Sequence, residues 1–206
     1  MLKKPKLNKM DITLLKDIKT DNLSNYYIFN EEVKNYNIKN LEVDGCHFKK
    51  VDFNNNEFNK LSVVDCIFEN CDLSNITFEI NTILRCEFIN CKIIGLNLNY
   101  THVNDVTFNS CKLDYSNFIN ANFKRTSFYE CSLESLRMYE NKLNDVTFNK
   151  CNLINFEVMN TSLKDIDLSD SCIDGIAFNI KDMNGLTINI YQAANIATSM
   201  GLIIKK

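Results

Sequence analysis

The sequence places an apolar residue at every fifth position over most of its length. In steps of five from Leu23 to Ile188, all 34 positions hold Leu, Ile, Val, Phe or Met, and 12 of the 14 phenylalanines lie on this grid. A period of five fits neither an α-helix, at 3.6 residues per turn, nor a free strand, at two. It predicts a solenoid whose backbone turns a corner every five residues and sends one large apolar side chain inward each time.

The position two residues before each grid residue is expected to point inward as well, because side chains alternate along an extended segment. We therefore expect small or apolar residues there. Eight of the nine cysteines occupy such positions, and only Cys172 lies one residue away. The positions that fit are Cys46, Val51, Leu61, Cys66, Cys71, Ile76, Cys86, Cys91, Leu96, Val106, Cys111, Ala121, Cys131, Val146 and Cys151.

A second period, of 20 residues, sets the length of one coil. Two series carry it: Cys71, Cys91, Cys111, Cys131 and Cys151, and Phe48, Phe68, Phe88, Phe108, Phe128 and Phe148. Twenty residues are four pentapeptides, so each coil has four faces, and like residues stack about 4.8 Å apart as the structural core. From Val43 to Met183 the register does not slip, which predicts about seven to eight coils in a rod roughly 35–40 Å long.

These pentapeptides resemble those of the pentapeptide-repeat family, whose loose pattern is small, Asp or Asn, Leu or Phe, then two polar residues. Clear examples are Cys71-Asp72-Leu73-Ser74-Asn75, Ala121-Asn122-Phe123-Lys124-Arg125 and Cys151-Asn152-Leu153-Ile154-Asn155. The resemblance implies an all-β fold, a right-handed quadrilateral parallel β-helix. We assign it residues 23–184, with an N-terminal segment at 1–22 and a C-terminal module at 185–206.

The C-terminal module departs from the grid and is predicted to form a strand, a short helix that ends at Gly201, and a final apolar strand. One helical face carries Ala193, Ile196, Ala197 and Met200. The module either caps a monomer or joins two chains. Gln192-Ala193 followed by Gly201-Leu202-Ile203 resembles the Qnr/MfpA-type branch of the family, which implies an end-to-end homodimer. Its predicted contact residues are Ile190, Ala193, Ile196, Ala197, Met200, Leu202 and Ile203.

The N-terminal segment and the coil differ in charge. Residues 1–42 carry eight Lys and six acidic residues, residues 43–183 carry 13 basic and 20 acidic residues, and the whole chain has a net charge of −3. The first residues lack the apolar stretch of a signal peptide, and no run of 18 apolar residues predicts a membrane span. The apolar residues of the segment either fold over the first coil, or the segment is a mobile basic arm; they are Leu7, Ile12, Leu14, Leu15 and Ile18.

No catalytic, cofactor or metal site is predicted. The cysteines recur at spacings of 5 and 20 rather than at zinc spacings, so we interpret them as small apolar side chains in a reducing cytoplasm. His47 and His102 should point outward without a partner set for general-base or zinc chemistry. The sequence has no Gly-rich phosphate loop. We expect a protein that is not an enzyme.

Two outward columns are candidates for the surface. One alternates in sign and suggests a ladder of exposed salt bridges, which would help register and solubility: Asp65, Arg85, Asp105, Arg125, Asp145 and Asp165. The other is apolar and is flanked by Ile80. It is either a contact stripe for a protein partner or ordinary scattered exposure: Tyr100, Ile119, Tyr139 and Met159.

The predicted function is that of a binding protein. A groove that neutralises phosphates also attracts a rod with outward carboxylates, although a modest net charge makes any such DNA mimicry local. The Qnr/MfpA resemblance implies DNA gyrase, or topoisomerase IV, as partner and an effect on quinolone sensitivity. The unbroken register leaves no room for the loops that interrupt the coil in plasmid-borne Qnr proteins. The alternative is a scaffold for an unrelated cytoplasmic protein. We expect no direct contact with nucleic acid or membrane.

Overall fold

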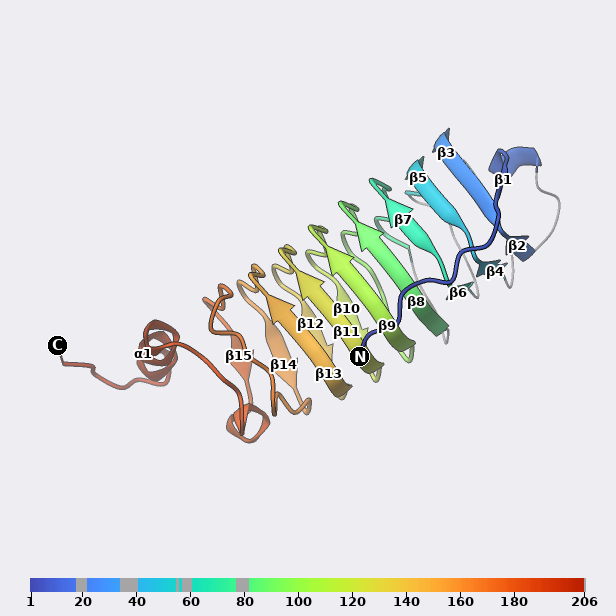
Figure 1. Ribbon diagram of the computed structural model, residues 1–206. Coiled ribbons are helices and arrows are strands. Elements are labelled where there is room, and N and C mark those ends of the chain that lie inside the picture. The colour runs from blue at the N-terminus through green and yellow to red at the C-terminus, as the bar shows by residue number, and fades with distance from the viewer. Residues whose placement is uncertain (18–21, 34–40, 55, 57–60, 77–81, 206) are drawn as a thin grey trace.

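The chain winds into a parallel β-solenoid in which each residue lies beside the residue 20 positions later (Figure 1). In the computed structural model, Phe108 pairs with Phe128, and Phe128 with Phe148. The structure describes residues 1–17, 22–33, 41–54, 56, 61–76 and 82–205. It has about seven turns, so the predicted quadrilateral β-helix with a C-terminal helix is confirmed. The grid residues Ile38, Phe58 and Phe78 lie outside the described residues.

The described strands form two parallel sheets. The eleven-stranded sheet contains β1 (Asp11–Ile12), β2 (Asn22–Ser24), β3 (Tyr26–Glu32), β4 (Leu41–Asp44), β5 (His47–Asp52), β6 (Leu61–Val64), β7 (Ile67–Glu69), β8 (Thr82–Ile89), β9 (His102–Asn109), β11 (Asn122–Tyr129) and β13 (Lys142–Asn149). The four-stranded sheet contains β10 (Asn117–Ile119), β12 (Arg137–Tyr139), β14 (Glu157–Met159) and β15 (Ala177–Phe178).

Each coil has four walls, which we number by their grid residues. Wall 1 contains Val103 and wall 2 contains Phe108. Wall 3 contains Leu113, and wall 4 contains Phe118 and forms the four-stranded sheet. The strands β8, β9, β11 and β13 run through walls 1 and 2 without a break, so the larger sheet bends around the corner between these walls.

Stacked phenylalanines form the centre of wall 2. The rings of Phe88, Phe108, Phe128 and Phe148 lie nearly parallel, with centroids 4.8–4.9 Å apart. Phe48 and Phe68 extend the stack toward the N-terminus. The stack spacing equals the distance between neighbouring strands, because each ring comes from the same position of successive coils.

Some of the inward positions two residues before the grid carry polar side chains. Seven of those described are buried Asn, Ser or Thr: Asn56, Thr101, Ser116, Thr126, Asn141, Thr161 and Ser171. The Thr161 hydroxyl accepts from the N–H of Asn141 and donates to the carbonyl of Met138, 23 residues earlier. The cysteines share the second contact, since the thiol of Cys131 donates to the Phe108 carbonyl at 3.3 Å. These positions therefore hold small or apolar side chains as predicted, since Val51, Ile76 and Val106 are buried there too, and the small ones also bond to the backbone of neighbouring coils.

The corners are built from left-handed backbone. Gly45, Gly95, Gly175, Gly185 and 22 other residues among those described have φ between about 49° and 82° at the corners, while Gly201 follows α1. They recur every five residues, at the ends of the walls. Asn and Asp tolerate this conformation better than other non-glycine residues do, which explains their frequency at the corners.

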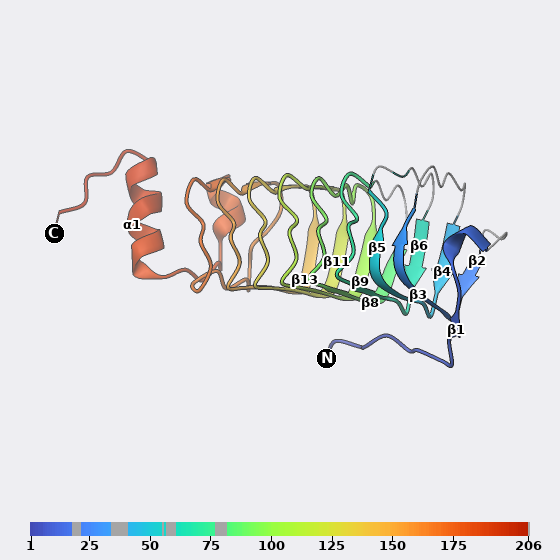
Figure 2. The same cartoon turned by 90° about the horizontal axis from the view of Figure 1, so that it is seen from above.

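The N-terminal end of the rod is covered by the chain itself. Strand β1 pairs with β3, and the following 3₁₀ helix (Leu15–Asp17) buries Leu15 over the first coils. Ile12 and Leu14 are exposed, and Leu7 lies further along the outside of the rod. Ile18 lies outside the described residues. Residues 11–17 thus contact the first coil, whereas residues 1–10 run back along the rod (Figure 2).

The C-terminal end is closed by a short 3₁₀ helix (Ile180–Met183) and by α1 (Ile190–Ser199). Asn189 and Gln192 form a capping box at the start of α1. The Gln192 side chain is buried and also donates to the carbonyls of Leu168 and Ser171 in the coil below. An amide at this place satisfies carbonyls that the end of a solenoid would otherwise leave unpaired.

One prediction for this end was wrong, that of a final strand. The face of α1 that packs on the coil centres on Gln192 and Ile196, and Met200 is 53% exposed. The predicted strand at residues 202–204 is absent from the described residues, since Leu202 to Lys205 form no regular structure. An isolated strand needs a neighbour to pair with, and this chain offers none there.

Candidate interaction surfaces

The bend between walls 1 and 2 carries a column of residues, which we call the corner column. Four of its charged residues form two bidentate ion pairs, each reaching back one coil: Arg85 to Asp65 and Arg125 to Asp105, with Nε–Oδ1 distances of 2.6 Å. These are the ion pairs of this column among the described residues, so the predicted ladder is present as two separate pairs. The column comprises Asn25, Gly45, Asp65, Arg85, Asp105, Arg125, Asp145, Asp165 and Gly185.

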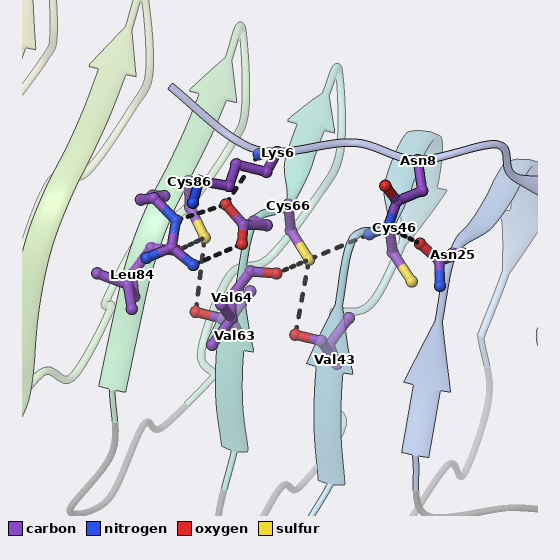
Figure 3. Close-up of polar contacts among 12 residues, drawn as sticks. Lys6, Asn8, Asn25, Val43, Cys46, Val63, Val64, Cys66, Leu84 and Cys86 are labelled. Carbon is purple, nitrogen blue, oxygen red and sulfur yellow. Dashed lines mark hydrogen bonds and ion pairs between the residues drawn. The ribbon is translucent and has the colours of Figure 1, made fainter. Parts of the chain in front are cut away.

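The first half of the corner column is covered, not exposed as we predicted. Residues 1–10, here called the N-terminal strap, lie along it (Figures 2 and 3). The N–H of Lys6 donates to Asp65 Oδ1 at 2.8 Å, and the N–H of Lys3 donates to Asp105 Oδ1 at 3.0 Å. Both aspartates are buried, Asp105 to 2% exposure. Asp145, further along the column, is exposed.

The surroundings of these two aspartates keep them ionised. Hydrogen bonds from Arg125 lower the pKa of Asp105, which outweighs the opposing effect of burial. Burial alone would raise the pKa of Asp65, but the hydrogen bonds from Arg85 and from the Lys6 backbone outweigh it, so that pKa is lowered too. Because the pKa of each aspartate is lowered in the folded state, its ionised form stabilises the fold at pH values above the ordinary aspartate pKa. That contribution is lost as the pH falls through the lowered value.

The apolar column that we predicted as a partner surface lies on wall 4. Ile119, Tyr139 and Met159 are direct neighbours on β10, β12 and β14 and are half-buried. The Tyr139 hydroxyl donates to the Glu157 carboxylate, which raises the pKa of the tyrosine. Tyr100 is 59% exposed at the corner that follows this wall, between Leu98 and Val103. Ile80 lies outside the described residues.

Two exposed tyrosines occupy left-handed corners on either side of wall 4. Tyr100 has φ 58° and Tyr115 has φ 60°, and Tyr115 is 60% exposed. A bulky aromatic residue in this conformation costs free energy that Asn or Gly does not. Residues kept at such a cost often serve a function. Tyr115 is therefore a further candidate for the predicted partner surface, beside Tyr100 and Tyr139.

Replacing Tyr115 by Asn is expected to raise the free energy of unfolding by about 1 kcal/mol. Asn75 and Asn155 occupy the same corner of other coils with the same backbone, at φ 60° and 56°. Urea denaturation measures the change. The control is Tyr129→Asn, since Tyr129 is also exposed but is not among the left-handed residues. A loss of stability in Tyr115→Asn as large as in the control would contradict the strain argument.

Exposed apolar residues gather beyond the last coil. Ile190 and Tyr191 open α1, while Leu202 and Ile203 follow it, with Ile203 90% exposed. Ala193 and Ala197 are half-buried, and Ile196 is buried within the chain. Of the predicted dimer contacts, Ile190, Met200, Leu202 and Ile203 are thus fully available to a partner. Figure 1 shows α1 and the tail that follows it projecting from the end of the rod.

The unpaired acidity of the rod is concentrated in its last coil. Residues 165–182 contain five Asp and one Lys. Asp165, Asp167, Asp170 and Asp174 are exposed, and Asp182 is buried. Earlier carboxylates are more often neutralised, as in the pair between Asp72 and Lys92 at 2.8 Å. The predicted acidic surface is therefore local to this end.

The cysteines and histidines show no converging set. Burial raises the pKa of Cys66, as expected for a neutral thiol in a core. Cys172 is exposed. His47 lies 3.4 Å from Glu69 on wall 2, and His102 is exposed on wall 1 of a coil further along. Within the described ranges, no three His, Cys, Asp or Glu side chains converge on a metal position, and no helix is long and apolar enough to cross a bilayer.

Sequence comparison agrees with the geometry of the coil. The family profile described as "Pentapeptide repeat region" matches residues 61–138 and 105–178, together more than half of the chain. The chain belongs to the pentapeptide-repeat family. Members of this family wind in a right-handed sense, and this chain has the 20-residue register and the four walls of such a coil. No curated protein matches the chain by sequence.

Solved structures of pentapeptide-repeat proteins resemble the chain over most of its length. Full-length QnrB1, a plasmid-mediated fluoroquinolone resistance protein, is 18% identical with a TM-score of 0.41, covering 93% of this chain and 95% of that one. HetL from Nostoc sp. strain PCC 7120, a pentapeptide-repeat protein involved in heterocyst differentiation regulation, is 12% identical with a TM-score of 0.37, covering 81% and 89%. Likenesses at this level carry no argument about activity.

Proposed function

We propose that this pentapeptide-repeat protein is a non-catalytic binding protein that presents its acidic last coil to the phosphate-binding groove of DNA gyrase or topoisomerase IV. It would thereby change the quinolone sensitivity of that enzyme. The observation that supports this most is the cluster of four exposed aspartates at residues 165–174, in a coil with a single basic residue between positions 165 and 182. Carboxylates spaced by one strand offer a basic groove the charge that it otherwise finds in phosphates.

A supercoiling assay with purified gyrase, with and without a quinolone, tests this function. We expect the protein to change supercoiling or the quinolone concentration that inhibits it, and the effect to weaken with salt. The combined variant Asp165→Asn, Asp167→Asn, Asp170→Asn and Asp174→Asn should lose the effect. A control that neutralises as many carboxylates elsewhere, at Asp44, Asp52, Glu87 and Glu130, should keep it. If the unaltered protein changes neither quantity, the proposal fails.

We also propose that two copies join end to end through their C-terminal modules. Ile190 and Tyr191 at the start of α1 and Leu202 and Ile203 after its end are all exposed past the last coil, and among the described residues the segment after α1 pairs with no strand. A second copy would cover these side chains and supply a strand partner. The two acidic last coils would then lie near the middle of one longer rod.

The double variant Leu202→Asp and Ile203→Asp is expected to be a monomer at micromolar concentration, whereas the unaltered chain is a dimer. Charges placed in an apolar interface must be desolvated, which weakens association strongly. Light scattering measures the mass. The control is Ile180→Asp, a similarly exposed isoleucine in the 3₁₀ helix that precedes α1, outside the predicted contact residues. A monomeric unaltered chain would remove the dimer.

A second candidate function is a scaffold for an unrelated protein, favoured by wall 4. Tyr100, Tyr115 and Tyr139 together give it rigid aromatic side chains of the kind that dominate protein interfaces. A pull-down at low and moderate salt distinguishes the two functions. Recovery of gyrase that falls with salt supports the acidic coil, and capture of a different protein that survives salt but is lost with Tyr139→Ser supports wall 4.

A further inference from the structure

We propose that the corner column is a binding track for an extended, lysine-rich segment of another protein, and that the N-terminal strap occupies this track as a built-in competitor. The structure shows what the track accepts, because residues 1–10 already lie in it. This inference does not rest on the proposed contact with gyrase, because the strap contacts Asp65 and Asp105, whereas that contact uses the last coil and shares only Asp165 with the column.

The spacing of the strap matches the spacing of the coils. Lys3 and Lys6 are three residues apart, and the aspartates that they contact, Asp105 and Asp65, are two coils apart. An extended chain advances about 10 Å in three residues, and two coils span about 9.6 Å. The backbone N–H groups of an extended segment therefore meet an acidic side chain at each such step, whatever the side chains of the segment are.

The side chains of the strap show which sequences the track would favour. Leu2, Pro5, Leu7 and Met10 are half-buried against the rod, whereas the four lysines between them are exposed. The positive charges of Lys3 and Lys6 help to hold the nearby carboxylates in their ionised form. An extended segment with apolar residues two or three positions apart, and lysines between them, has the same chemistry.

The recognition depends on buried groups, not on a surface cluster of acids. Asp65 and Asp105 each accept from an arginine of the next coil and from the backbone of the strap. Each arginine orients the carboxylate with which it pairs, and that carboxylate can still accept a hydrogen bond from a backbone N–H of an extended segment. Asp145 lacks a hydrogen bond to the strap among the described residues and serves as a control on the same column.

The first test asks whether the track is a separable site. A variant without residues 1–9 keeps β1 and Leu15, and a fluorescent peptide of the sequence MLKKPKLNKM is titrated against it by anisotropy up to 1 mM. In the full chain the strap competes with the peptide at a local concentration of about 1 mM, the value typical of a flexible tether. If the open track binds the peptide with a dissociation constant of about 0.1 mM, the full chain should bind it about tenfold more weakly. Equal binding to both proteins, or no saturable binding to a folded deletion variant, would overturn the proposal.

The second test uses the full chain and keeps the proposal falsifiable if the deletion variant does not fold. We expect trypsin to cleave after Lys6 and Lys9 at least tenfold faster in the double variant Asp65→Asn and Asp105→Asn than in the unaltered chain, because the docked strap resists the protease. Asp145→Asn should not change the rate. Cleavage at one rate in all three proteins would show that the strap does not depend on the track. The mass of the unaltered chain could also rise with its concentration, and this rise could be lost when residues 1–9 are removed. That result would assign the track to a second copy of the chain and would contradict a partner of another kind.

Discussion

Replacing Phe108 by Ala is expected to lower the free energy of unfolding by about 3–5 kcal/mol, the largest effect of any single substitution considered. Phe108 is fully buried, and its ring lies between those of Phe88 and Phe128, with centroids 4.8 and 4.9 Å away. Truncation removes the burial of the ring and leaves a cavity that two neighbouring coils line. In a solenoid each coil contacts only its neighbours, so the loss falls on both interfaces of that coil.

Urea or thermal denaturation measures this effect, and Phe29→Ala is its control. Phe29 lies off the five-residue grid, is exposed on β3 and belongs to no stack of the core, so its loss should cost less than about 1 kcal/mol. If both substitutions cost the same, the stack does not carry the stability assigned to it.

Replacing Asn141 by Leu is expected to cost about 2–3 kcal/mol, although leucine is apolar and of similar size. The Asn141 side chain is buried, accepts from the N–H of Ala121 at 2.8 Å and donates to the carbonyl of Phe118 at 2.7 Å. Leucine removes both contacts. Buried backbone groups that lose a partner in a low-dielectric core carry the full cost of desolvation.

The matched control is Asn141→Thr, which should cost less than about 1 kcal/mol. Thr161 occupies the same position one coil later and makes the equivalent contacts with its hydroxyl, to the N–H of Asn141 and the carbonyl of Met138. Denaturation curves of the two variants at the same pH measure the difference in their free energies of unfolding. A leucine variant as stable as the threonine variant would show that these positions select for size alone.

The repeat could be predicted from the sequence because each position of the solenoid has one environment that recurs. The five-residue grid gives the inward direction, and the 20-residue spacing of Phe68, Phe88 and Phe108 gives the coil. The backbone contacts of Asn141, Thr161 and Ser171 at the other inward position could not be predicted from the repeat, because Val, Leu or Ile occupies that position in many coils.

The ends could be predicted only in part, because no repeat constrains them. Asn189 and Gln192 carry the spacing of a capping box, which is a readable signal. The second role of Gln192, donation to Leu168 and Ser171, depends on how α1 turns onto the coil. The strap contacts Asp65 and Asp105 through backbone N–H groups, which every residue except proline has. No side-chain pattern marks such a contact.

A crystal structure of the full chain tests the central claim most directly, since every proposed surface depends on the 20-residue register. The account predicts that the rings of Phe68, Phe88, Phe108 and Phe128 stack with centroids 4.8–4.9 Å apart, with the strap along the bend beside them. Phenylalanines that lie on different walls, or coils of any other length, would contradict it.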